Sequence, residues 1–492
     1  MKLSISIFMF TAMFFLPVAQ ASSMSETLSM QQVLQKVINH YPSIKTAALQ
    51  LEKAKQENIK VESQLSWLLK GNAAYTRDTS LFGTATDRYN LAGSMNRGLE
   101  NGGILGFNAN VSREDAEDTF SPALPNPSTK TRVDINYRHR LAKGAGNPLY
   151  EEGLTLSEAG QKVASSEQLA LYDRLADQVV ELYLSAAITQ ARISSIDKTI
   201  ERGQRLQKYI QQEFGLGLSE EKDVLQVDAR LSINKADKQS LQVAWQKQLI
   251  SLNRLMGRDW NAGLKPDARI IAQQTESVDD IFRQVQTHSP ELKRIDAQLE
   301  IAESAIRSQR DKRKDELDLV VFLGNEINQG ESSIGDQDES ELIGGISLEF
   351  NRGLDKSGLD AELRQAHFDR GVALQDKKQV LEDLQYSVSS LLAEIRMSES
   401  ALKAFSVSVK AEQKKLDEAL KRYRDGRIET DRIIEFESQL AVAELSHDLQ
   451  SIELTRRYHQ LDLIRGQIWK SITFPDYRFD DYISSKNDRE YN

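Results

Sequence analysis

The sequence predicts a mainly helical fold with a smaller β part, built from two copies of one unit. Three observations support this prediction. The phrase LNRLMGRDW at 252–260 returns as LDLIRGQIW at 461–469, with Leu, Gly and Trp at the same offsets. Long segments repeat apolar residues in alternating steps of three and four, which is typical of helices packed side by side. Shorter segments before them alternate apolar and polar residues, as strands do.

The offsets between matching residues define the repeats. Trp260 and Trp469 are separated by 209 residues, whereas His40 and His288 are separated by 248. The first copy therefore carries 39 more residues than the second, which is the difference between these offsets. The expected organisation is a signal peptide at 1–21, a first repeat at 22–260, a linker at 261–276, a second repeat at 277–470 and a C-terminal tail at 471–492.

Each repeat is expected to contain a long helical hairpin. The seam of apolar residues runs from Tyr172 to Phe214 and, in the same register, from Leu381 to Tyr423. The hairpins are expected at about 150–256 and 355–469, and their tips at Gly217 and Gly426, because glycine suits the left-handed position that ends a helix. A helix from Tyr150 to Phe214 would be about 100 Å long at ~1.5 Å per residue, so the molecule should be elongated.

Alternating segments precede each hairpin. The expected strands are at about 69–77, 89–95, 105–111 and 132–141 in the first repeat, and at 317–326 and 342–351 in the second. Strands 89–95 and 105–111 lie in the surplus residues, which predicts a hairpin unique to the first copy. The apolar members expected on one face of the later strands are Val133, Ile135, Tyr137, Ile346, Leu348 and Phe350.

A half-buried soluble sheet is the ordinary explanation of such alternation. Two or three strands per copy, however, cannot enclose a core between helices of this length. A sheet closed by several subunits would pair every edge and could lie in lipid, with its apolar side outward and its polar side toward a lumen. The six apolar residues named above are therefore expected to face lipid.

The first residues indicate export. Lys2 precedes an apolar run from Leu3 to Leu16, and Ala19-Gln20-Ala21 is a small-residue cleavage pattern. This is typical of a secretory signal peptide cleaved after Ala21. The alternative, a transmembrane anchor, needs about 20 apolar residues, and this run is shorter.

Composition excludes several classes of site. There is no cysteine, which excludes disulfides, thiolate metal sites and a lipid-bearing N-terminal cysteine, so the chain is expected not to be lipidated. The formal net charge of −10 argues against nucleic-acid binding. The six histidines form no H-E-x-x-H pattern, and there is no phosphate-binding G-K-[ST]. No catalytic, cofactor or metal site is expected.

The order of helix, strands, long helix, glycine turn and return helix, written twice after a signal peptide, resembles the outer-membrane efflux protein family typified by TolC. The residues that carry the resemblance include RLAKGAG at 140–146, FGLGLSEEKDVLQVDARL at 214–231, FNRGLDKSGLDAELRQA at 350–366 and YRDGRIETDRIIEFESQL at 423–440. The resemblance implies a homotrimer in the outer membrane of a Gram-negative bacterium. Each chain would give four strands to a twelve-stranded barrel and its helices to a periplasmic tunnel.

The extra hairpin departs from this pattern. Either six strands per chain join the barrel, or the hairpin extends beyond the membrane, and we prefer the second alternative. The resemblance also implies partners, namely a periplasmic adaptor and an inner-membrane transporter. The expected function is that of a passive export duct in a tripartite efflux or type I secretion system. A secreted coiled-coil scaffold without a pore is the alternative.

The resemblance implies gate residues at the tips of the hairpins. In the family, an aspartate nine residues after an aromatic residue helps to close the aperture, and Asp223 matches this position after Phe214. Nine residues after Tyr423 stands Arg432, which does not match, and Glu435 follows three residues later. Tyr423 itself matches a family tyrosine that holds the closed state. Links among Asp223, Tyr423 and Arg432 would keep the tip shut; alternatively, all four are solvated turn residues.

Overall fold

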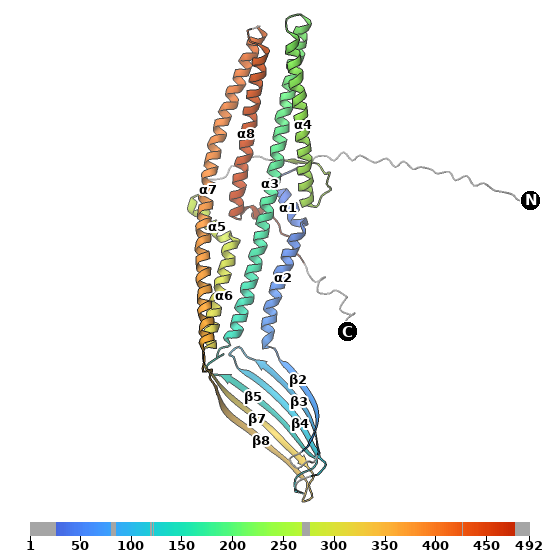
Figure 1. Ribbon diagram of the computed structural model, residues 1–492, viewed down its shortest axis with the longest axis vertical. Coiled ribbons are helices and arrows are strands. Elements are labelled where there is room, and N and C mark those ends of the chain that lie inside the picture. The colour runs from blue at the N-terminus through green and yellow to red at the C-terminus, as the bar shows by residue number, and fades with distance from the viewer. Residues whose placement is uncertain are drawn as a thin grey trace, which may run out of the picture.

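The computed structural model describes residues 26–79, 85–118, 121, 123–267, 276–425 and 427–477. The molecule is elongated, with a curved sheet at one end and long paired helices at the other (Figure 1). The expected mainly helical fold class with long helical hairpins and antiparallel strands is confirmed. The expected signal peptide, residues 268–275 of the linker and the tip residue Gly426 lie outside the described residues.

Two helices of 68 residues dominate the structure: α3 (Pro148–Gly215) and α7 (Ser357–Arg424). Each is followed by a shorter return helix, α4 (Glu221–Met256) or α8 (Thr430–Ile464). The hairpins therefore occupy 148–256 and 357–464, against the expected 150–256 and 355–469. At ~1.5 Å per residue each long helix extends for about 100 Å.

The return helices cover only the upper half of each long helix. The lower half is covered by a second pair of segments, α1 (Met30–His40) with α2 (Pro42–Glu62), and α5 (Val278–His288) with α6 (Pro290–Lys312). Helix α3 packs on α2 and α4, and α7 packs on α6 and α8 (Figure 1). Each repeat thus lays two shorter pieces end to end along one long helix.

The doubled Leu-Gly-Trp phrase forms the joint between these pieces. Gly257 ends α4 with a φ of 65°, and Gly466 follows α8 with a φ of 69°. A Cβ atom at Gly257 would lie 2.0 Å from Cδ2 of His40, and one at Gly466 would lie 2.3 Å from Nδ1 of His288. The end of each return helix therefore meets the histidine that ends the lower segment, which explains why glycine and histidine occur at both places.

The buried cores follow the same duplication. Val37, Val179 and Leu252 are fully buried in the first repeat, in a cluster that includes Tyr183. Their counterparts Val285, Val388 and Leu461 are buried together in the second repeat. A third cluster near the tips joins Leu206 and Ile210 of α3 to Ile433 of α8. The two hairpins are thus packed against each other as well as within themselves.

One antiparallel sheet contains every long strand, in the order β2-β3-β4-β5-β7-β8. The strands are β2 (Leu68–Thr79), β3 (Ala85–Gly98), β4 (Ile104–Ala116), β5 (Ser128–Arg140), β7 (Glu316–Gly330) and β8 (Gln337–Asn351). A separate parallel pair joins β1 (Glu26–Leu28) to β6 (Leu264–Pro266). Short 3₁₀ turns occur at Ser63–Leu65 and Gln467–Ser471.

The extra hairpin belongs to this sheet. Strand β3 pairs with β2 from Leu68↔Asn96 to Thr79↔Ala85, and β4 pairs with β5 from Ile104↔Arg138 to Glu114↔Ser128. The preference for a hairpin that projects beyond the sheet was wrong, and so was the expectation of four strands per chain. The physical reason is that β3 and β4, with 14 and 13 residues, match their neighbours in length and carry the same alternation in register.

Replacing Gly257 with Ala should destabilise the protein, because the new side chain would be held at a positive φ and would collide with His40. The expected loss is about 1–3 kcal/mol, measured by thermal or urea unfolding followed through helical circular dichroism. Gly160→Ala on α3 is the matched control, since its Cβ would meet nothing within 4 Å. The control should be stabilised by about 0.5–1 kcal/mol. Equal behaviour of the two variants would contradict the role of the joint.

Candidate functional site

The sheet has one continuous apolar face. On β5, Tyr137 and Ile135 lie opposite Val321 and Leu323 of β7, and Val321 in turn lies opposite Ile346 of β8. The register places all six apolar residues expected from the alternation on this one face, namely Val133, Ile135, Tyr137, Ile346, Leu348 and Phe350. Five of them are exposed, and Tyr137 is half-buried.

The other face of the sheet is polar. It is rich in asparagine, with Asn72, Asn90, Asn96, Asn108, Asn110 and Asn136 in register. Asp134 is buried on this face, and its carboxylate accepts hydrogen bonds from Asn108 Nδ2 at 2.9 Å and from Arg132 Nε at 3.0 Å. Figure 1 shows the labelled helices at one end of the sheet and none against its faces. The described residues therefore leave the apolar face without a covering layer.

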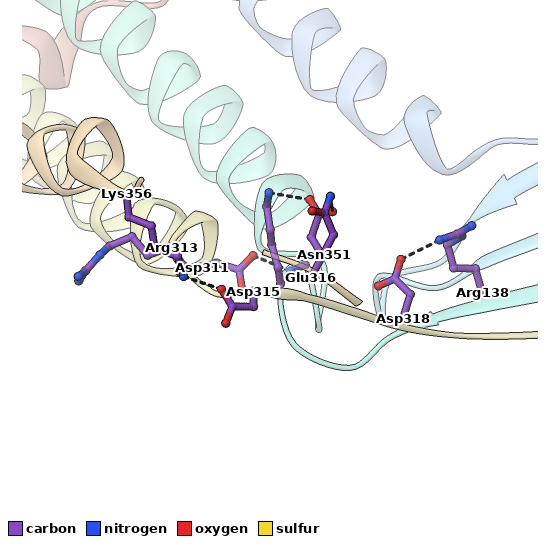
Figure 2. A network of polar contacts seen from close by, with 10 residues as sticks. Arg138, Asp311, Arg313, Asp315, Glu316, Asp318, Asn351 and Lys356 are labelled. Atoms are coloured by element: carbon purple, nitrogen blue, oxygen red, sulfur yellow. Dashed lines mark hydrogen bonds and ion pairs between the residues drawn. The ribbon is translucent and has the colours of Figure 1, made fainter. Parts of the chain in front are cut away.

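A charged network joins the sheet to the helices (Figure 2). Arg138 Nη1 of β5 donates to Asp318 Oδ2 at 2.9 Å and to Glu349 Oε2 at 2.6 Å, which links three strands. Lys356, before α7, reaches Asp315 Oδ1 at 2.6 Å, and this hydrogen bond lowers the pKa of the Asp315 carboxyl. These contacts fix the direction in which the helices leave the sheet.

Asp223 makes local hydrogen bonds in the turn at the tip of the first hairpin. The turn after α3 includes Gly217 at a φ of 74°. Asp223 Oδ2 accepts hydrogen bonds from Ser219 Oγ at 3.1 Å and from the Glu220 backbone N–H at 3.2 Å. Asp223 thus forms part of a capping box at the start of α4, in which its carboxylate accepts a hydrogen bond from the backbone N–H of the N-cap residue Glu220.

Tyr423 joins elements of both hairpins. Its hydroxyl lies 3.0 Å from Thr430 Oγ1 across its own turn, and its ring lies 5.5 Å from the ring of Tyr209 on α3. Burial raises the pKa of the Tyr423 hydroxyl, so the group stays neutral. Asp223 and Tyr423 line the same groove of about 410 Å³ between the two tips.

The other two gate candidates lie elsewhere. Arg432 Nη1 is 2.8 Å from Glu435 Oε2, one turn further along α8, and both side chains are exposed. Neither residue lines the groove that contains Asp223 and Tyr423. Arg432 is therefore paired with Glu435 in this chain rather than with Asp223.

The sequence reasoning missed a polar cluster between the hairpins. Arg202 of α3 forms an ion pair with Glu444 of α8 at 3.4 Å, and Glu437 lies on the same side of α8. Arg202, Tyr423 and Glu437 line a cavity of about 460 Å³. Burial raises the pKa of the Glu437 carboxyl, and the positive charges of Arg202 and Arg205 partly oppose this shift. No local sequence pattern marks this cluster, because Arg202 is more than 200 positions away from Glu437 and Glu444.

This arrangement of helices and strands is similar to solved outer-membrane channels. The outer-membrane channel OprN matches with a TM-score of 0.61 and 18% identity, over 89% of each chain. VceC of Vibrio cholerae matches with a TM-score of 0.61 and 15% identity, over 91% of this chain and 97% of that one. MtrE of Neisseria gonorrhoeae, an outer-membrane channel in its open state, matches with a TM-score of 0.56 and 16% identity, over 89% and 88%.

The chain has the TolC-like fold. No family model matches the sequence, and no curated protein matches it. The resemblance that the doubled order of elements indicated is thus confirmed at the level of the fold. The TolC-like sheet of this chain differs from the expectation in having six strands instead of four.

Two further observations concern the described part of the TolC-like chain. Its helices include none that is both long enough and apolar enough to cross a membrane. Across the same residues, no three His, Asp or Glu side chains gather as ligands for a metal ion.

Replacing Glu437 with Gln should stabilise the packing of the hairpins at neutral pH. Because the folded carboxyl has a raised pKa, its own contribution to stability is largest at acidic pH and is lost as the pH rises through that pKa. Gln cannot ionise, so the unfolding temperature of the variant should change less with pH. Glu444→Gln is the control and should have the opposite effect at neutral pH, because it removes the partner of Arg202. A parallel pH dependence of wild type and Glu437→Gln would refute the assignment.

Proposed function

We propose that three copies of this chain form a passive channel through the outer membrane. The observation that carries the proposal is the sheet, which has an uncovered apolar face, a polar opposite face and helices only at one end. An apolar face of this kind is stable when lipid covers it, and the polar face then lines an aqueous lumen. The lipid-facing residues would be Val133, Ile135, Tyr137, Ile346, Leu348 and Phe350.

The edges of the sheet support closure by several copies. Strands β2 and β8 are the two outer strands, and each would present unpaired backbone groups. Such groups cannot remain unpaired within lipid, so a closed barrel is required. Three chains would contribute eighteen strands, because each has six in its sheet. Barrel diameter grows with strand number, so the lumen would be wider than that of a twelve-stranded barrel.

The helices would form a tunnel on the periplasmic side of the membrane. Their length of about 100 Å suits a structure that reaches toward an inner-membrane partner. We propose that the channel docks with a periplasmic adaptor and an inner-membrane transporter, as part of a tripartite efflux or type I secretion system. The fold similarity to outer-membrane channels and the expected secretory signal support this assignment. The chain itself would perform no catalysis and would hold no cofactor.

The alternative of a scaffold without a pore accounts for the helical hairpins but not for the sheet. A coiled-coil scaffold in water has no use for an exposed apolar face across six strands, because such a surface would drive aggregation. The paired strands and their uniform register therefore favour the channel.

The proposal is tested by expressing the full chain and separating the membranes. The protein should sediment with the outer membrane, run as a trimer on gels without heating and as a monomer after boiling, and conduct ions in planar bilayers. A protein that stays in the aqueous fraction and carries no current would overturn the channel.

Tyr423→Ala should raise the single-channel conductance, because it removes both the hydroxyl contact with Thr430 and the ring contact with Tyr209. Asp223→Ala should have the same effect by loosening the start of α4. Arg432→Ala and Glu435→Ala change an exposed pair outside the groove and serve as controls. If the conductance of the Asp223 and Tyr423 variants matches that of wild type, these residues are not part of a gate.

A further inference from the structure

We propose that the internal duplication determines how one copy of this chain contacts the next. In this contact, His40 and Trp260 of one copy bind Glu382 of the neighbouring copy, and β2 pairs with the neighbouring β8 so that Lys70 faces Glu349. The inference rests on the proposed function, because it assumes that the copies close into a ring. The occupant of the free surface is thus a second copy of the same chain.

The contact between the two repeats within one chain is the template. Helix α3 of the first repeat packs on α6 and α8 of the second repeat, and β5 pairs with β7. Helix α7 is the counterpart of α3, yet its main contacts in the described residues are with α5, α6 and α8 of its own repeat. Helices α2 and α4, the counterparts of α6 and α8, likewise pack mainly on α3. Helix α7 on one side of the chain, and α2 with α4 on the other, are therefore available for the same kind of contact with another copy.

Asp173 of α3 is the polar centre of the template. It accepts a hydrogen bond from Trp469 Nε1 at 2.8 Å and lies 3.1 Å from His288 Nε2. The repeat offset of 209 carries Asp173 to Glu382 and Trp469 back to Trp260, and the offset of 248 carries His288 back to His40. Histidine and tryptophan are retained, and Glu382 supplies the carboxylate of Asp173 on a side chain longer by one methylene group.

The exposure of these residues differs between the two places. The Asp173 side chain is 20% exposed, whereas that of Glu382 is 68% exposed, with Lys378 as an ion-pair partner 3.8 Å away. Trp469 is half-buried, whereas Trp260 is 66% exposed. The indole and the carboxylate that are joined in the template thus both face solvent where no neighbouring copy is present.

The apolar residues around these positions follow the same rule. Phe368, Val372, Tyr386 and Met397 of α7 lie on the same face of the helix as Glu382, and all four are exposed. The counterpart of Phe368 is Ala159, which is fully buried in the template. On the opposite surface, exposed Val243 of α4 is the counterpart of buried Ile452. A stripe of this length in water is explained by burial against another copy.

The strand register follows from the same offsets. In the template, Arg140 of β5 lies opposite Asp318 of β7. The offset of 209 relates Arg140 to Glu349 of β8, and the offset of 248 relates Asp318 to Lys70 of β2. The equivalent pair between two copies therefore also has opposite charges, with the positive and negative residues exchanged. The same register places Asn351 opposite Leu68, which aligns the ends of β8 and β2 nearest the helices. Both contacts join unlike surfaces head to tail, and an interface of this kind gives a ring when its rotation closes, as the proposed trimer requires.

The absence of cysteine from the sequence permits a direct test in the full-length protein. Lys70→Cys combined with Glu349→Cys should give a covalent trimer on a denaturing gel after oxidation. Arg140→Cys with Asp318→Cys is the template control and should crosslink within one chain, leaving a monomer. Lys70→Cys with Ile343→Cys is the register control, because Ile343 is six residues from Glu349, or about 20 Å at ~3.4 Å per residue.

The outcomes separate this inference from the channel itself. A trimer seen on unheated gels that crosslinks at Ile343, or at neither position, overturns the register while the channel stands. Absence of any oligomer, with the template control intact, overturns both proposals. Crosslinking at Glu349 alone supports the inference.

The helical contact is tested separately by trimer stability. Trp260→Phe, which keeps a ring but removes the indole N–H, and Glu382→Ala should each lower the temperature at which the trimer dissociates. The double variant should lose no more than the larger single effect, because both residues act through one contact. Lys403→Ala, at an exposed position on another face of the same helix, should leave the trimer unchanged. Additive losses for Trp260 and Glu382 would show that the two residues do not meet.

Discussion

The structure depends on covering the apolar seam of two helices that are each about 100 Å long. Most of the stability of a helix in a protein comes from the packing of its apolar face, so the seam of a 68-residue helix needs packing partners along its length. This chain supplies them as two shorter pieces per long helix, a lower segment that leads to the sheet and an upper segment that returns from the tip. The joint between the pieces then becomes a fixed point, where Gly257 meets His40 and Gly466 meets His288.

The sheet is constrained in a different way. Its six strands share one register and one alternation, and among the described residues no further layer lies against the apolar face. The charged contacts around Arg138 and Lys356 hold the sheet in line with the helices. Strand β2 follows α2, and β8 leads into α7. The two edges of the sheet therefore lie on the same two sides of the molecule as these helices. A single mode of association between copies would satisfy both.

The resemblance and the structure assign different roles to the residues at the tips of the hairpins. The resemblance pointed to Asp223, Tyr423, Arg432 and Glu435 as one group. The structure gives Asp223 a capping role, places Tyr423 between the hairpins and pairs Arg432 with Glu435 at a distance from both. It adds Arg202 and Glu437, which line the cavity between the hairpins and were not identified by any motif.

The sequence by itself determined the duplication, the helical hairpins and the two-faced strands, because each of these is written in local periodicity or in a fixed offset. It also predicted the TolC-like fold through the order of the elements. Only the tertiary structure decided that the extra hairpin joins the sheet, since strand pairing depends on the matching of lengths and registers between distant segments. The same holds for Asp173, which meets His288 and Trp469 although 115 and 296 positions separate them. Contacts of this kind follow from how helices pack in space, and no local pattern records them.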